Sequence, residues 1–412
     1  MRFHYAWVVT GVTFLALLVA AGVRGAPGVV IVPLEAEFGW DRASISLAVA
    51  VSLLTFGLAG PISGTLIDRL GPRRILVFGL LLLALGLAPL LFMRELWQLH
   101  LLWGVVVGLS TGAVGHVLGA AVAQRWFRAH RGLVMGLFGG ATSAGQLVFV
   151  PTMMALVVTI GWRSAIGLLA AASLALVLPV GLLMRDRPED VGAVAYGGVK
   201  TASERREDAR RTSLRDAAKR RDFWLLAGSF FICGYTSNGL IGTHLIPHAV
   251  EHGFTEVTTA AAVGLMGAMN IVGTLASGWL SDRYDNRKLL AAYYGFRALS
   301  LAGLPFILHV PELMLFAVVY GLDWVATVPP TVNLIASIFG RASVGALYGW
   351  VWFGHMVGAA TAAYAGGFFR TILGDYHLTF ISAAIAGFVA VALALRIEPR
   401  PRVAVEPVAQ PA

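Results

Sequence analysis

A short charged turn occurs twice in this chain, each time between two long apolar runs. The first copy begins at Gly64 and reads Gly-Thr-Leu-Ile-Asp-Arg-Leu-Gly-Pro-Arg-Arg, and the second begins at Gly278 and reads Gly-Trp-Leu-Ser-Asp-Arg-Tyr-Asp-Asn-Arg-Lys, 214 residues later. A second pattern, three glycines beginning at Gly132, returns at Gly345 with an offset of 213 residues. Two independent repeats with nearly the same period predict a chain built from two similar halves.

The apolar runs are long enough to cross a bilayer. The chain is 58% apolar and only 13% charged, and a helix needs about 20 apolar residues to span a hydrocarbon core about 30 Å thick. The expected spans are 7–33, 43–67, 74–93, 98–124, 132–160, 164–184, 223–250, 258–280, 289–308, 313–339, 345–369 and 377–396. We therefore predict an all-α membrane protein with twelve transmembrane helices in two six-helix pseudo-symmetric halves.

Basic residues are distributed unevenly between the two sides of such a bundle. Assigning the loops to alternate sides places 25 of the 31 Lys and Arg residues on the side that holds both termini. Because cytoplasmic loops carry an excess of Lys and Arg, we expect both termini in the cytoplasm and the chain in the cytoplasmic (inner or plasma) membrane. The net charge of +9 then reflects topology, and we expect no nucleic-acid partner.

Motifs of enzymes and cofactor proteins are not apparent in the sequence. The single cysteine, Cys233, lies in an apolar span, which excludes a disulfide framework within the chain. Nothing resembles a catalytic triad, a phosphate-binding loop or a metal cluster. We therefore expect no enzymatic activity, no cofactor and no metal.

The repeats also predict the domain boundaries. We expect an N-terminal six-helix half at 1–184, a cytoplasmic linker at 185–222, a C-terminal six-helix half at 223–396, and a Pro-rich disordered tail at 397–412. The later part of the linker, 213–223, predicts a short amphipathic helix. This helix lies either on the anionic inner leaflet or in solvent as a linker.

Charged side chains deep in apolar helices are costly in lipid, so each is a candidate functional residue. Arg24 stands in the first span beside a Gly/Pro interruption that ends at Pro27 and Gly28. A broken helix of this kind is expected where it lines a cavity, and the planar guanidinium suits a carboxylate ligand. The alternative is an arginine that extends to the outer interface.

Arg297 and Asp323 fall near the midplane on consecutive spans. A mutual ion pair is the least costly way to bury them, so we expect a structural pair or gating element. The alternative is a direct role in substrate binding or proton coupling.

Six further residues in the apolar spans are candidates for contacting a solute. They are His116, Asn238, His244, Asn270, Trp324 and His355. Asn238 belongs to a polar, weakly helical patch with Gly239 and Gly242. A histidine titrates near neutral pH and can move a proton together with an anion. The alternative for each histidine is a packed, hydrogen-bonded residue, and Trp324 either closes the pocket or packs in the core.

The two charged turns are candidates for gating. Their residues are Gly64, Asp68, Arg69 and Arg73 in the first copy and Gly278, Asp282, Arg283 and Arg287 in the second. We expect their Asp and Arg side chains to make inter-helix contacts that hold an outward-open state and break when the halves rock. The alternative is the positive-inside rule alone, which does not require Gly and Asp at matching positions.

The repeated turn resembles the loop motif of the major facilitator superfamily, which lies between helices two and three and again between helices eight and nine. Within that superfamily the chain is similar to the bacterial monocarboxylate transporter and oxalate/formate antiporter group. The similarity rests on residues 38–45 (Phe-Gly-Trp-Asp-Arg-Ala-Ser-Ile) and 347–355 (Leu-Tyr-Gly-Trp-Val-Trp-Phe-Gly-His). The resemblance implies that helices four, seven, eight and eleven line or gate a central cavity.

The resemblance also implies pocket positions at His355, where the group carries a basic residue, and at His244 and Asn270. The chain departs from the group on helix eight, where the expected arginine is absent and Thr274 follows Asn270 by one turn. Arg24 is then expected to supply the positive charge from another helix. Animal members of the group carry an acidic-Gly-Gly-Trp-Gly-Trp signature early in helix one, which residues 4–7 match only in part.

These observations predict a monomeric secondary active transporter that moves a small organic anion by alternating access. A carboxylate is the expected solute and symport with protons the expected coupling, because a proton bound with a carboxylate leaves less net charge to cross the membrane. The alternative is an efflux antiporter for amphipathic or neutral small molecules, with purely structural buried charges. A third hypothesis, a membrane sensor or scaffold, lacks an attached domain of the usual size in this sequence.

Overall fold

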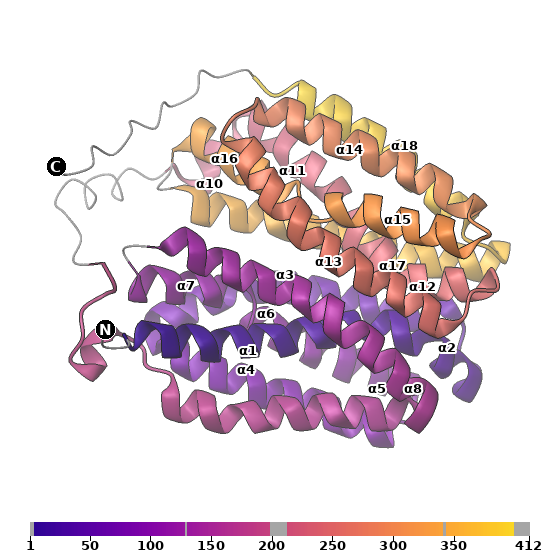
Figure 1. Cartoon of the computed structure of the whole chain (residues 1–412), viewed down its shortest axis with the longest axis horizontal. Coiled ribbons are helices and arrows are strands. Elements are labelled where there is room, and N and C mark those ends of the chain that lie inside the picture. The colour runs from indigo at the N-terminus through magenta and orange to yellow at the C-terminus, as the bar shows by residue number, and fades with distance from the viewer. Residues whose placement is uncertain (1–3, 128–129, 198–211, 341–342, 399–412) are drawn as a thin grey trace.

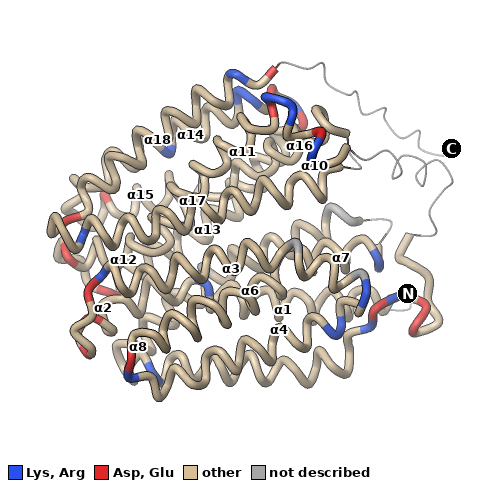
Figure 2. Tube along the Cα trace, turned by 180° about the vertical axis from the view of Figure 1, so that it is seen from behind, with Lys and Arg blue, Asp and Glu red and all other residues tan. Residues whose placement is uncertain are grey.

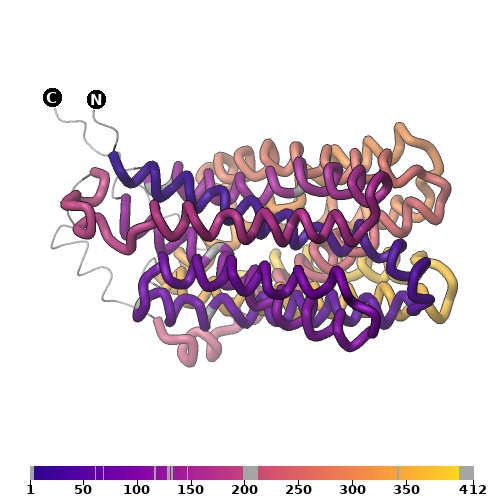
Figure 3. The backbone as a smooth tube through the Cα atoms, turned by 90° about the horizontal axis from the view of Figure 1, so that it is seen from below, coloured from indigo at the N-terminus to yellow at the C-terminus, as the bar shows by residue number. Residues whose placement is uncertain are grey.

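The computed structural model describes residues 4–127, 130–197, 212–340 and 343–398. Nearly all of these residues are helical, and no β-strand forms among them. The helices run along the long axis of the molecule, and residues 4 and 398 lie at the same end, here called the termini end (Figures 1 and 3). The opposite end is called the far end. The predicted disordered tail and most of the predicted linker lie outside the described residues.

The first half contains six passes. Its elements are α1 Ala6–Gly25, α2 Pro27–Phe38, α3 Arg42–Leu70, α4 Pro72–Leu87, η1 Ala88–Phe92, α5 Leu96–Leu99, η2 His100–Val107, α6 Gly108–Ala113, α7 His116–Trp126 and α8 Arg131–Leu183. The predicted fifth and sixth spans form the two arms of α8, which turns back at Gly161 with φ +83°. Only glycine adopts this conformation without strain. Asp41 caps α3 by accepting a hydrogen bond from the Ser44 amide at 2.9 Å.

Two short helices, η3 Pro188–Val191 and α10 Leu214–Ala218, lie in the described parts of the predicted linker, and the second half also contains six passes. The elements of the second half are α11 Arg221–Gly234, η4 Tyr235–Ile241, α12 Gly242–Glu251, α13 Glu256–Ser281, α14 Asn286–Gly303, η5 Leu304–Phe306, α15 Val310–Asp323, α16 Val328–Phe339, α17 Val344–Leu373 and α18 His377–Leu395. The predicted linker helix is present as α10, a single turn and a half that is capped by Ser213.

The surface of the bundle fits a bilayer. Nine helical segments of the described chain are long and apolar enough to span a membrane. Counting the two arms of α8 separately and adding α14 and α17 gives the twelve predicted passes. Charged residues gather at the two ends and leave a largely uncharged middle (Figure 2). Large apolar side chains such as Leu85, Leu178 and Leu275 are at least 67% exposed there, as expected for a lipid-facing surface.

The two halves share a hydrophobic core only away from the termini end. The shared core includes Ile31 and Ile166 of the first half and Leu245 and Phe380 of the second. At the termini end each half has a core of its own, and neither of these cores includes a described residue of the other half. The halves therefore meet at the far end and are packed separately at the termini end.

Four passes are interrupted near the middle of the bundle, and each is the first of a group of three. The first is broken between α1 and α2 because Pro27 lacks a backbone N–H. The fourth is broken at Val114–Gly115, the seventh forms the π-helix η4, and the tenth is broken over residues 324–327. Such interruptions in a membrane are tolerated where the backbone is buried in protein or lines a cavity, and π-helices are frequent at functional sites.

Candidate functional site

Several of the predicted solute-contacting residues lie at these interruptions. Arg24 is on the last turn of α1, Asn238 is inside η4, and Trp324 directly follows α15. His116 begins α7, but its side chain lies outside the described part of the structure. The sequence located the break beside Arg24 and the weakly helical patch around Asn238. It did not indicate the break after Asp323.

Arg24 points into a small cavity inside the first half. The cavity of about 30 Å³ has room for about two water molecules. It is lined by Val23, Arg24, Pro27, Val49, Ser52, Leu53, Phe56, Trp103, Val107 and Thr111. The guanidinium carbon lies 4.9 Å from the centre of the Phe56 ring, and Nε is buried without a hydrogen-bond partner. No carboxylate among the described residues pairs with this cation.

Three predicted residues of the second half form one hydrogen-bonded group. The Asn238 side chain lies between Trp324, whose Nε1 is 3.4 Å from Oδ1, and His355, whose Nε2 is 3.3 Å from Nδ2. The imidazole of His355 stacks on the Trp352 ring at a centroid distance of 4.9 Å and contacts the tilted Phe230 ring at 4.7 Å. We call Trp324, Asn238 and His355 the amide relay.

The predicted contact between Arg297 and Asp323 is present and is buried. Arg297 Nε donates to Asp323 Oδ2 at 2.6 Å, and Nη2 donates to the carbonyls of Asp323 and Trp324 at 2.7 and 3.1 Å. Nη1 donates to Cys233 Sγ at 3.0 Å. Asp323 Oδ1 has no hydrogen-bond partner in the described structure. The pair therefore ties the break in the tenth pass to α14 and α11, next to the amide relay.

Asn270 lies at a contact between the two halves. Its Nδ2 donates to Ser143 Oγ of α8 at 2.8 Å, and its Oδ1 accepts from the Val325 amide and from Thr274 Oγ1, both at 3.2 Å. The amide group therefore joins the first half to the broken tenth pass. The sequence did not indicate the contact with Ser143, because a serine in an apolar helix carries little signal.

A polar network closes the far end, and the sequence did not predict it. Arg42 of α3 pairs with Glu35 and lies 3.1 Å from Glu251 of the second half. Glu251 also pairs with Arg370 at 2.9 Å, and Arg42 donates to the Tyr376 hydroxyl at 2.6 Å. We call these five residues the far-end latch. The only hint in the sequence was the rarity of charge on this side of the membrane.

His244 belongs to this far-end region and is separate from His355. Its Nε2 donates to the Ala363 carbonyl at 2.7 Å, and its Nδ1 lies 3.3 Å from the Tyr376 hydroxyl. Both ring nitrogens are therefore occupied by protein groups.

Thus the predicted solute-contacting residues do not share one pocket in this arrangement. Arg24 lies in the first half, the amide relay in the second, Asn270 between them, and His244 at the far end.

The described contacts of the two charged turns remain within their own halves. Arg73 binds the end of α8 through Asp186 and the Gly181 carbonyl. Arg287 binds Asp285 and donates to the Ile397 carbonyl at 2.9 Å. Its hydrogen bonds to Asp285 hold the pKa of that carboxyl below the usual value. Gly64 and Gly278 lie within the last two turns of α3 and α13, and the side chain of Asp68 lies outside the described structure.

The remaining residues of these turns face outward. Arg69, Asp282 and Arg283 are exposed, and the Arg283 guanidinium carbon lies 4.1 Å from the centre of the Trp279 ring.

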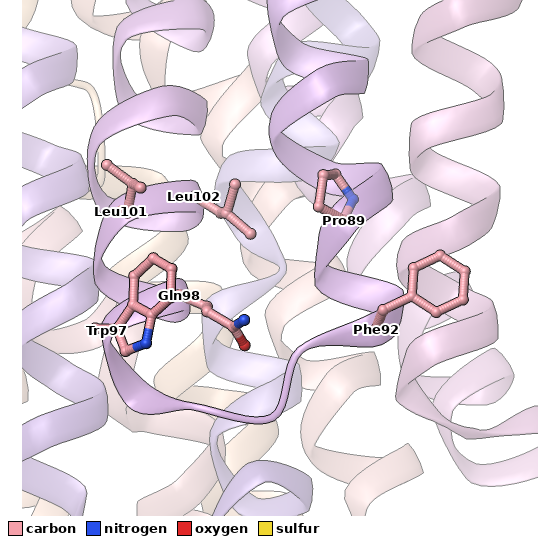
Figure 4. Close-up of a pocket in the computed structure, with 6 residues that line it drawn as sticks. All are labelled: Pro89, Phe92, Trp97, Gln98, Leu101 and Leu102. Atoms are coloured by element: carbon pink, nitrogen blue, oxygen red, sulfur yellow. The ribbon is translucent and has the colours of Figure 1, made fainter.

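A hollow of about 350 Å³, larger than the Arg24 cavity, lies at a surface turn after η1 (Figure 4). It is lined by Pro89, Phe92, Trp97, Gln98, Leu101 and Leu102. Phe92 and Trp97 are 81% and 61% exposed, which suits a membrane interface better than a solute site.

Comparison with known proteins identifies the family of this bundle. A model of the Major Facilitator Superfamily matches residues 13–337. The chain belongs to this superfamily. The protein is therefore a transporter and not an enzyme, and its two six-helix halves have the major facilitator fold.

This major facilitator has curated relatives along nearly its whole length. The uncharacterised MFS-type transporter YcxA of Bacillus subtilis (strain 168) is 26% identical over 409 residues, which is 95% of both chains. Monocarboxylate transporter 13 of Rattus norvegicus is 28% identical over 92% of this chain and 86% of its own. A crystal structure of a bacterial homologue of the human lysosomal transporter Spinster, in an inward-facing and occupied conformation, matches with a TM-score of 0.76 at 14% identity. It covers 96% of this chain and 97% of its own, and shows the shared fold.

The far-end latch gives a first testable expectation for this transporter. Changing Glu251 to Gln removes the charge that Arg42 and Arg370 share across the two halves. Losing about 1 kcal/mol of cross-half attraction should raise the far-end-open population about fivefold. Distances between spin labels at Ala36 and Val257, on opposite halves, measure this population by pulsed electron resonance.

The matched control for the latch is Glu37→Gln. Glu37 pairs with Arg163 and accepts from Trp162, all within the first half. This variant should leave the distance distribution unchanged. Equal distributions for Glu251→Gln and the parent protein would show that the latch does not hold the far end.

Proposed function

We propose that this transporter moves a small organic anion, a carboxylate, across the cytoplasmic membrane by alternating access coupled to protons. The observation that carries the proposal is Arg24. A partly buried cation inside a membrane span without a carboxylate partner is costly, and its guanidinium lies over the Phe56 ring. A solute carboxylate supplies the missing charge, and Ser52 and Thr111 add hydroxyl groups to the same cavity.

The cavity around Arg24 is too small for a carboxylic acid in this arrangement. A cation over an aromatic ring gains about 2 kcal/mol or more when desolvated, but the ring accepts none of the paired hydrogen bonds that a carboxylate accepts from a guanidinium. Val49, which lines the cavity, also packs against Ala360 and Ala363 of α17. The cavity therefore borders the contact between the halves, and their movement changes the space around Arg24.

The packing of the halves supports alternating access. With the termini in the cytoplasm, the shared far-end core and the latch form the outer closure, and the separate cores lie at the open inner end. The halves at 1–184 and 223–396 move as two bodies joined by the linker 185–222. The charged turns contact each other's halves only when the inner end closes.

The relatives and the buried acid support the solute class and the coupling. Curated relatives over more than nine-tenths of the chain include monocarboxylate transporters. Asp323 Oδ1 is a buried carboxylate oxygen without a partner, so this oxygen can accept a proton while Oδ2 stays with Arg297. A proton carried with a carboxylate cancels one charge in transit.

Uptake of radiolabelled short-chain carboxylates into proteoliposomes under an inward proton gradient tests the proposal. Arg24→Ala should reduce uptake at least about tenfold, since one charge-assisted contact is worth about 1.5–3 kcal/mol. Arg24→Lys should retain part of the activity because it keeps the charge but not the planar fork. Arg94→Ala, which changes an exposed arginine at the far end, should transport like the parent.

The competing function is efflux of amphipathic or neutral compounds, and the mostly apolar lining of the Arg24 cavity favours it. In that case Arg24→Ala would transport as well as the parent protein. No uptake of any carboxylate, together with resistance to amphipathic compounds on expression, would support efflux instead.

A further inference from the structure

The hydrogen bonds of His244 at the far end have fixed directions. The Ala363 carbonyl can only accept, so His244 Nε2, at 2.7 Å from it, must carry a hydrogen. A neutral imidazole with its hydrogen on Nε2 has a lone pair on Nδ1. The Tyr376 hydroxyl, at 3.3 Å from Nδ1, therefore donates its hydrogen to His244.

The same hydroxyl group joins the two halves. Arg42 of α3 donates from Nη1 to the Tyr376 oxygen at 2.6 Å, and a guanidinium offers no acceptor in return. Tyr376 thus accepts from a cation of the first half and donates to a histidine of the second. All three side chains are buried. Each hydrogen bond in this chain has both its donor and its acceptor only while His244 is neutral.

A second proton on His244 changes both the hydrogen bonding and the charge. Nδ1 would then carry a hydrogen, so the Tyr376 hydroxyl would lose its acceptor and face donors on both sides. The hydroxyl would also lie between two cations, the imidazolium of the second half and the Arg42 guanidinium of the first. Buried charges are screened much less than exposed ones. Separation of the halves at the far end relieves both costs.

The acidic side chains of this region already have partners. Glu35 pairs with Arg42, and Glu251 pairs with Arg42 and Arg370. Among the described residues, no carboxylate forms a hydrogen bond or ion pair with His244. The titratable and charged side chains of the elements packed here are Glu35 of α2, Arg42 of α3, His248, Glu251 and His252 at the end of α12, Arg370 of α17, and Asp375, Tyr376 and His377 at the start of α18.

Two more histidines lead from His244 to the outer surface. His248 and His252 follow it at intervals of four residues, which places all three on one face of the end of α12. The His248 ring centre lies 4.1 Å from that of His252 and 5.7 Å from that of Tyr376. His252 Nδ1 donates to the His248 carbonyl at 2.8 Å, which leaves a lone pair on Nε2 of this half-buried residue. The stripe therefore offers protons a path from the outer side to His244.

We propose that His244 is the proton-sensitive element of the far-end latch, and that a proton taken from the outer side onto its Nδ1 separates Arg42 from Tyr376 and opens the far end. One proton leaves the outer solution and one positive charge appears on the imidazole. His244 is a positioning residue that contacts no solute. The proposal rests on the alternating access proposed above and deepens it by naming what opens the outer closure.

The sign of the pH dependence follows from linkage. The open arrangement hydrates His244 and removes Arg42 from its neighbourhood, so it binds the proton more tightly than the closed one. A ligand shifts a protein toward the state that binds it better, and the far-end-open population must therefore rise as the pH falls.

Pulsed electron resonance on the full-length protein in lipid nanodiscs, labelled at Ala36 and Val257 and without solute, tests the proposal. The far-end-open population should rise at least about threefold between about pH 8 and about pH 5, a range that includes the titration of histidine. His244→Gln keeps a donor for the Ala363 carbonyl but takes up no proton in this range, so it should abolish the rise. His244→Asn, a second neutral replacement, should abolish it as well.

The matched control is His100→Gln. His100 lies at the far end of the first half, and its Nε2 is 2.9 Å from the Ser44 carbonyl of the same half. This variant should respond to pH like the parent. Acid opening caused by Glu35 or Glu251 would persist in both His244 variants. A parent that does not open with acid, or a response of His244→Gln as large as that of the parent, would overturn the proposal.

Failure of this inference and failure of the proposed function give different results. If carboxylates are taken up but His244→Gln opens with acid as the parent does, the anion function stands and His244 does not control the latch. If the opening depends on His244 but no carboxylate is taken up, the anion function fails and the proton-sensitive latch stands.

Discussion

Asp323→Asn is expected to lower the free energy of unfolding by about 3–5 kcal/mol, because it leaves Arg297 as an uncompensated buried charge. Arg297 has no exposed surface through which water could solvate it: its side chain is 0% exposed in the pair. Asparagine keeps the shape of the carboxylate and one acceptor oxygen, so the loss measures charge and not packing. Unfolding in detergent with increasing denaturant or temperature measures the change.

The control for this prediction removes both charges. In Arg297→Gln/Asp323→Asn the remaining amides can still hydrogen-bond to Thr236 and to the carbonyls of Asp323 and Trp324, which Arg297 binds in the parent. This double variant should therefore be more stable than Asp323→Asn alone, although it contains one more substitution. A double variant less stable than the single one would mean that Arg297 stabilises the fold through its hydrogen bonds and that its charge is unimportant.

The contact between these two residues could be predicted because depth in a membrane follows from sequence position. A helix rises about 1.5 Å per residue, so residues at equal distances from the membrane surface on consecutive helices must lie at the same level. Arg297 and Asp323 met this condition. The same reasoning located the spans and the break beside Arg24, both of which depend on local spacing.

Position around the helix axis could not be predicted in the same way, because glycine-rich apolar helices have no clear polar face. Arg24 and His355 stand near the middle of their passes, yet one faces the interior of the first half and the other that of the second. The far-end latch depends on how the two halves meet, and its members come from segments more than 100 residues apart. No local pattern links Arg42 to Glu251.

The second large effect is expected at a close contact between α3 of the first half and α17 of the second. A Cβ atom added to Gly367 of α17 would lie 2.3 Å from Ser46 Oγ and 2.8 Å from the Arg42 carbonyl of α3. Nearby, Val49 and Ala50 pack against Ala360 and Ala363, so the surrounding contact offers no free space for a larger side chain while the far end is closed. Gly367→Leu should therefore prevent closure of the far end.

Transport by alternating access requires each end to close in turn, so Gly367→Leu should reduce carboxylate uptake at least about 100-fold, which corresponds to about 2.8 kcal/mol against the closed state. The spin labels at Ala36 and Val257 should report only the longer distances. Gly11→Leu is the matched control, because Gly11 is exposed and has no atom within 4 Å of an added Cβ. It should leave both uptake and distances unchanged.

A second substitution on α17, Gly349→Leu, should affect closure of the opposite end of the bundle. Gly349 has open space around an added Cβ in this arrangement, since it lies toward the termini end, where the halves are packed separately. If the halves rock about the middle of the bundle, Gly349→Leu should hinder closure of the termini end and leave the far end closed. Opposite shifts in the label distances for the two variants follow only from a rocking motion. A shift of the same sign in both would indicate general loosening of α17 and would contradict alternating access.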